Sequence, residues 1–177
     1  MPLSTPWAIA IGIAFLAGRY SFSEGVCRSP RGRNDFLLSL VSLIVLTAAA
    51  WGLTRVFSGR GAFLHYGAIL GTIMVANVAH VIIPGQRRMV EALKAGREPD
   101  PRDGLMGKQR SVHNTYFTLP VVFTMVSTHY AAVFGHRWSW LALVLLTMAG
   151  ALVRVWFVMR HNGRAPAWVW LGGVLLF

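Results

Sequence analysis

Four histidines lie inside or at the edges of long apolar segments of the chain: His65, His80, His113 and His129. Ionisable groups within a membrane segment are functional candidates, because placing them in lipid is costly. The segments that carry them are expected to run in opposite directions, so His65 and His129 should share one depth and His80 and His113 another. Two neutral imidazoles at one depth on neighbouring helices can be the axial ligands of a haem iron.

The rotational positions of these histidines restrict that interpretation. At about 100° per residue, His80 lies ~60° around its helix from His65, whereas His129 lies ~160° from His113. One face of a helix therefore cannot present both His113 and His129. We expect a haem b, if one is bound, between His65 and His129. The alternative is that His129 is an interfacial residue and that His113 caps or hydrogen-bonds the start of a helix.

The stretch KQRSVHNTYFTLP is the densest polar cluster at a predicted membrane boundary. Five side chains from it and just beyond it lie within about 60° of one helix face: His113, Tyr116, Pro120, Thr124 and Ser127. Such a stripe either lines a cavity or holds helices together, because polar groups facing lipid would lose their hydrogen bonds. Pro120 has no N–H, so it also leaves the carbonyl of Tyr116 available as an acceptor.

Two further polar residues lie within apolar segments. Arg154 either extends to the headgroups or points inward and holds an anion. Asn77 follows Gly67 and Gly71, and small and polar residues of this kind are typical of a close contact between membrane helices.

The composition places the chain in a membrane. Of its 177 residues 55% are hydrophobic and 13% are charged, and the mean hydropathy is +0.53. Soluble domains carry roughly 25% charged residues. The formal net charge is +11, but Lys and Arg flank the apolar segments, which argues against nucleic-acid binding. Cys27 is the only cysteine, which excludes an internal disulfide, a multi-cysteine metal site and a c-type haem attachment motif.

The elements that must position these residues are apolar helices. We expect an all-α polytopic transmembrane helix bundle in a single domain, residues 1–177, with five complete spans and a truncated sixth. The predicted spans are residues 7–22, 36–54, 61–83, 112–134, 138–159 and 167–177. Pro84 and Gly85 predict the end of the third span.

The connection 84–111 is predicted to be a long polar loop. Its RRMVEALKAG is expected to form a short amphipathic helix with Met89, Val90 and Leu93 towards the headgroups, and its GREPDPRDG a break; the alternative is a solvated linker. Of the 17 Lys and Arg residues, 13 fall in this loop and in the two connections on the same side, and three on the other side. This bias predicts a periplasmic amino-terminus and a cytoplasmic loop in a bacterial inner membrane.

Several of these stretches resemble one family. The segment from FSGRGAFLHYG to GREPDP, the segment KQRSVHNTYFTLPVVFTMVSTHY, CRSPRGRND and RHNGRAPAW are similar to the bacterial membrane-bound urate hydroxylases, the urate oxidase N-terminal domain family. That resemblance implies oxidation of urate to 5-hydroxyisourate, with electrons passed to a c-type cytochrome domain. This chain resembles the later membrane helices of the family without the cytochrome. It departs from the family at Thr115, where a second asparagine is expected, and at His80, where an aromatic residue is expected.

The resemblance suggests roles for individual residues. Arg110 and Asn114 would hold the urate anion, with His113 as base and Tyr116 in the same catalytic group; the further assignments are Arg154 and Asn77 for substrate binding, and His65 and His129 for haem. Lipid, urate and a c-type cytochrome are the expected partners, and the chain alone is expected to be inactive. The alternatives are a small anion transporter or channel and a b-type cytochrome subunit.

Overall fold

The computed structural model describes residues 4–28, 35–161, 163 and 167–175, and every regular element in this part of the chain is a helix. In order the elements are α1 (Thr5–Arg28), α2 (Asp35–Val56), α3 (Gly59–Asn77), the π-helix η2 (Val78–Ile82), α4 (Ile83–Lys94), α5 (Pro101–Ser127), α6 (Ala131–Phe134), α7 (Ser139–His161) and α8 (Ala167–Leu175). The prediction of an all-helical protein is confirmed.

Long apolar helices dominate this arrangement. Within the described residues, three helical stretches are long and apolar enough to cross a membrane: Leu37–Val56, Gly59–Lys94 and Ser139–Arg160. A shorter apolar stretch runs from Thr5 to Gly18. The structure thus supports a helical protein with membrane-length segments, while the larger number of complete spans remains a prediction.

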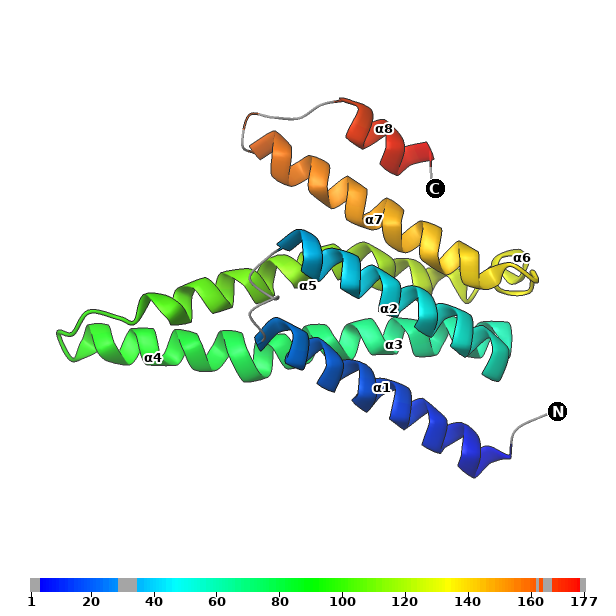
Figure 1. The fold of residues 1–177 in the computed structure, drawn as a ribbon, viewed down its shortest axis with the longest axis horizontal. Coiled ribbons are helices and arrows are strands. Elements are labelled where there is room, and N and C mark those ends of the chain that lie inside the picture. Colours follow the sequence, from blue (N-terminus) through cyan, green and yellow to red (C-terminus); the bar gives the residue numbers. More distant parts are fainter. Residues whose placement is uncertain (1–3, 29–34, 162, 164–166, 176–177) are drawn as a thin grey trace.

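The bundle is built around α3 and α5, which pack against each other along much of their length. On the other side of α5 lies α7, while α2 contacts both α3 and α7 (Figure 1). The outer positions belong to α1, which packs on α3, and α8, which packs on α7. The buried core at the centre includes Leu53, Phe63, Tyr66, Leu70 and Leu143.

Glycines lie at two close contacts between α5 and its neighbouring helices. A Cβ at Gly67 of α3 would overlap the Thr124 hydroxyl, and a Cβ at Gly150 of α7 would lie 2.9 Å from Cδ of Pro120. The prediction that Gly67 lies in a close helix contact is therefore confirmed. A Cβ at Gly71 would meet no atom within 4 Å, so Gly71 has no such role.

The predicted helix end at Pro84 is wrong. The helix that begins at Gly59 continues through Pro84 to Lys94, and Figure 1 shows α3 and α4 as one long rod. Proline has no N–H, and its ring would meet the carbonyl four residues earlier. The π-helix immediately before Pro84 widens the turn, with the Ile83 N–H bonded to the Val78 carbonyl, and so accommodates the ring.

The predicted long loop is a helical hairpin instead. Its first arm is α4, its turn is Ala95–Asp100 with Gly96 at φ +68°, and its second arm is the beginning of α5 (Figure 1). The helix predicted to begin at Val112 starts at Pro101, because Asp100 caps it by accepting the Arg102 N–H at 2.9 Å.

The amphipathic helix predicted in this region is present as part of α4. Val90 and Leu93 are exposed as expected, but Met89 is not directed towards headgroups, because its thioether lies against Gly104 of α5. The predicted span 112–134 is also interrupted, since α5 ends at Ser127 and the short α6 follows. The last predicted span contains α8, which ends at Leu175 among the described residues.

Candidate functional site

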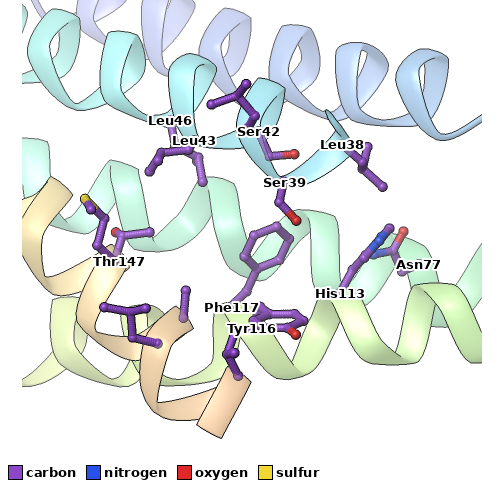
Figure 2. Close-up of a pocket in the computed structure, with 15 residues that line it drawn as sticks. Leu38, Ser39, Ser42, Leu43, Leu46, Asn77, His113, Tyr116, Phe117 and Thr147 are labelled. Atoms are coloured by element: carbon purple, nitrogen blue, oxygen red, sulfur yellow. The ribbon is translucent and has the colours of Figure 1, made fainter. Parts of the chain in front are cut away.

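A cavity of about 350 Å³ lies among α2, α3, α5 and α7 (Figure 2). Most of its lining is apolar, and its polar side chains come from all four helices. The lining residues are Leu38, Ser39, Leu40, Ser42, Leu43, Leu46, Asn77, His113, Tyr116, Phe117, Thr147, Met148, Ala151, Leu152 and Val155. An apolar cavity with a few converging polar groups is the usual form of a small-molecule site.

Asn77, which lines one end of this cavity, belongs to a network of amides and a guanidinium. Asn77 donates from Nδ2 to Oδ1 of Asn114 at 2.8 Å and accepts at Oδ1 from Nη1 of Arg110 at 3.1 Å. Asn114 in turn donates from Nδ2 to the Met74 carbonyl at 3.0 Å. Asn77 and Arg110 are only 2% and 3% exposed, so these bonds satisfy groups that water does not reach freely.

The local sequence explains why these three residues meet. Arg110 and Asn114 are four residues apart on α5, so their side chains project from one side of the helix. Asn77 is the last residue of α3 before the π-helix. The sequence prediction placed all three at the substrate, and the structure brings them together as one hydrogen-bonded unit.

His113 and Tyr116, the first two residues of the polar stripe, line the cavity from α5 (Figure 2). In this view His113 lies at the same end of the cavity as Asn77. The remaining stripe residues are Pro120, Thr124 and Ser127, which are buried and do not line the cavity. Both interpretations of the stripe therefore apply, the cavity to its first turn and helix packing to the rest.

The opposite end of the cavity carries polar groups that the sequence interpretation missed. Thr147 lies there in Figure 2, and its hydroxyl donates to the Leu143 carbonyl at 2.7 Å. The Tyr66 hydroxyl, in a side chain that is 1% exposed, therefore donates to Thr147 at 2.9 Å. Ser39 and Ser42 complete the polar lining. Their spacing of three residues on an apolar helix was the available signal.

Arg154 does not line the cavity. Its Nε donates to the Thr115 hydroxyl at 2.9 Å. Thr115 is two residues from His113 and hence about 160° away around α5. The structure thus places Arg154 apart from the other residues predicted to bind substrate.

The histidines predicted as haem ligands have different surroundings. His65 bonds through Nδ1 to the Gly61 carbonyl at 2.8 Å, and its ring stacks on Phe57 at 4.2 Å. A Cβ on Gly12 of α1 would lie 2.7 Å from Nε2, so this nitrogen faces the backbone of α1 and has no room for an iron. His129 is exposed in the turn after α5. These surroundings do not fit a haem held between the two histidines.

Fold and cavity together define a class: a protein whose described elements are all helical, with membrane-length helices that line a largely apolar cavity with a polar end. The chain belongs to the urate oxidase N-terminal family, whose sequence model matches residues 1–177. The predicted family is confirmed, and it indicates a urate-related function. No curated protein and no solved structure matches the chain.

Proposed function

We propose that this chain is the membrane part of a urate hydroxylase-like oxidoreductase, which converts urate to 5-hydroxyisourate and passes the electrons to a c-type cytochrome. The observation that carries the proposal is the polar end of the cavity, where the Asn77–Arg110–Asn114 network adjoins the part of α5 that presents His113. Membership of the urate oxidase N-terminal family suggests urate as the substrate, and the cavity is where we place it.

The chemistry of this end suits a purine anion. Urate is flat and carries alternating N–H donors and carbonyl acceptors, which amide, imidazole and phenol groups can match. The buried cation of Arg110 favours an anion nearby. Phe117, which lines the cavity beside Tyr116, offers an aromatic ring for the purine to pack against. The cavity volume lies at the small end of the ~300–1,000 Å³ typical of ligand sites.

The reaction adds water and removes two electrons. Uric acid and water give 5-hydroxyisourate with the release of two electrons and two protons, so the site needs a base and an acceptor. We assign the base to His113, and we assign Arg110 and Asn114 to holding the Asn77 amide against the substrate. The acceptor is a c-type cytochrome outside this sequence, which has no attachment motif for such a haem.

A binding experiment tests the site independently of turnover. Urate is titrated into the purified chain in detergent, with hypoxanthine as the neutral purine for comparison. The expected result is preferential urate binding that Arg110→Gln weakens about tenfold or more, and that the exposed-residue control Thr118→Ala leaves unchanged. Equal affinity for the two purines, or no effect of Arg110→Gln, would contradict the proposed site.

A second experiment tests turnover. The chain alone is expected not to reduce an added acceptor in the presence of urate, whereas reduction is expected once the partner that supplies the electron route is added. Urate-dependent reduction by the chain alone would show that the proposed dependence on a partner is wrong. Urate uptake into vesicles without any oxidation would support the anion transporter instead.

The proposal also places the chain in the bacterial inner membrane, with the α4–α5 hairpin in the cytoplasm. The Lys and Arg distribution supports this orientation. A cysteine at Arg97, introduced after Cys27→Ser, should react with a membrane-impermeant maleimide only in inverted vesicles. Labelling of intact spheroplasts would show that the orientation is the reverse of the one proposed.

A further inference from the structure

Arg154 is a charged residue within an apolar helix. It is half-buried in the apolar α7, seven residues before the helix ends at His161, which corresponds to about 10 Å along the helix. A charge at such a depth is costly unless it is paired or reaches the headgroups.

The described partner of Arg154 is a neutral group. Its Nε donates to the Thr115 hydroxyl, and that hydroxyl donates onward to the Val112 carbonyl at 2.7 Å. None of the carboxylates whose side chains the structure describes forms an ion pair with Arg154. Among the described residues no carboxylate therefore balances this charge, and an anion is the group that the other guanidinium nitrogens would bind most strongly.

The surroundings of Thr115 indicate what that anion is. On α5, Ser111 lies one turn before Thr115 and Lys108 lies two turns before it, and both are exposed. Cations from α7 and α5 thus bracket two hydroxyls on the face of α5 turned away from the cavity. Lys108, Ser111, Thr115 and Arg154 are called the seam cluster below.

The face of α5 that carries Thr115 becomes apolar towards the end of the helix. Leu119, Val122 and Val126 follow Thr115 at spacings of four, seven and eleven residues, so they lie on the same helix face, and all three are exposed. A cationic and hydroxyl-bearing end that continues into an exposed apolar track has the order of a phospholipid, from headgroup to acyl chain.

The α5–α7 contact explains why Arg154 can reach this face. Gly150, one turn before Arg154 on α7, packs directly on Leu119 and Pro120. This close approach lets the Arg154 side chain cross from α7 to Thr115 on α5.

We propose that the seam cluster binds the phosphate of an anionic phospholipid, whose acyl chain lies along Leu119, Val122 and Val126. Basic pockets between membrane helices near the bilayer surface suit such headgroups, and a guanidinium can bond phosphate through two N–H groups. This site is separate from the cavity and does not depend on the urate chemistry. It requires only that α5 and α7 lie in a bilayer.

Native mass spectrometry of the purified full chain in detergent tests the proposal. Phosphatidylglycerol and phosphatidylcholine with identical acyl chains are added in turn. Phosphatidylglycerol adducts are expected to dominate, Arg154→Gln is expected to reduce them about tenfold, and Lys108→Gln severalfold. Arg160→Gln is the matched control, because Arg160 is an exposed arginine of the same helix that stacks on Trp156, and it should leave the adducts unchanged.

Several other outcomes would contradict the proposed lipid site. Equal binding of the two lipids, unchanged adducts in both Arg154→Gln and Lys108→Gln, or an equal loss in Arg160→Gln would overturn the proposal. Because Lys108 is exposed, its replacement remains informative even if Arg154→Gln fails to fold. Displacement of the lipid by millimolar inorganic phosphate would identify a small-anion site and overturn the lipid assignment. Arg154→Gln should bind urate with the same affinity as the wild type. A loss of urate binding in this variant would assign Arg154 to the substrate site instead of the lipid site.

Discussion

Arg110 of α5 donates a hydrogen bond of 3.1 Å to Asn77 of α3, and so a buried guanidinium is anchored at the residue where the α-helix gives way to a π-helix. π-Helical turns are often found at functional sites, because the extra residue per turn changes the direction of the side chains that follow. Here the π-helix also accommodates Pro84, so the proline and the buried network lie next to the same irregularity.

Replacing Asn77 by Leu should destabilise the protein and abolish urate binding. The leucine would leave an Arg110 N–H donor and the Asn114 Oδ1 acceptor facing an apolar group, at a cost of about 1–3 kcal/mol for each lost partner and more for the charged one. Thermal unfolding in detergent measures the first effect and urate titration the second.

The double variant Asn77→Leu with Arg110→Leu distinguishes a network from independent contacts. Because the double variant also removes the buried charge that lost its bond to Asn77, it should unfold at a higher temperature than Asn77→Leu alone. Additive losses of stability would show that the hydrogen bond between the two residues is energetically unimportant.

The contact between Gly67 and Thr124 should limit what α3 can carry. Gly67→Ala is expected to destabilise by about 1–3 kcal/mol through overpacking, because its Cβ would overlap the Thr124 hydroxyl. Gly71→Ala is the matched control four residues along the same helix, where a Cβ meets no atom, and it should be neutral or slightly stabilising. In the Gly67→Ala background, Thr124→Ser keeps the hydroxyl and should recover little stability. Thr124→Gly removes the hydroxyl and should restore the helix contact. Equal effects of the two glycine replacements would contradict this account.

The α4–α5 hairpin should open more readily at acidic pH. The hydrogen bonds from Arg88 to Asp103, one of them 3.0 Å from Nε to Oδ2, hold the pKa of the Asp103 carboxyl below its usual value. A carboxyl with a lowered folded-state pKa stabilises the hairpin above its unfolded pKa of ~3.9 and loses this effect as the pH falls through the folded value. Amide exchange at 85–105, corrected for intrinsic rates, should rise over this acidic window in the wild type. Asp103→Asn should show faster exchange at neutral pH and no such acidic transition, while unchanged exchange at neutral pH would contradict a role for the pair.

The sequence predicted the helices well where hydrophobicity alone decides, as in α2 and α7. It failed at Pro84, because a helix continues past a proline when the preceding turn widens, and the residues themselves carry no signal for that widening. The first part of α5 was predicted to be a loop. Its many charged residues obscure the helical pattern because its apolar face is narrow, and its capping residue, Asp100, lies between prolines.

The candidate site was predicted unevenly for a similar reason. The helical spacing of His113 and Tyr116 was enough to place them on one face. The hydrogen bonds that join Asn77 to Arg110 depend on how α3 and α5 pack, which spacing on either helix does not reveal. Ser39 and Ser42 were overlooked because serines in a membrane helix are unremarkable until a cavity is seen beside them.

The proposed base can be separated from a binding role by replacing His113 with Gln. A glutamine amide retains a donor and an acceptor but cannot take a proton near neutral pH, so urate affinity should stay within about threefold of the wild type. When turnover is supported by the proposed cytochrome partner, urate-dependent cytochrome reduction should fall by about 10²–10⁴-fold in kcat, the usual contribution of a general base. His129→Gln is the matched control, because His129 is exposed in the turn after α5, and it should change neither quantity. A loss of affinity with unchanged kcat would make His113 a binding residue, and full activity of His113→Gln would remove it from the site.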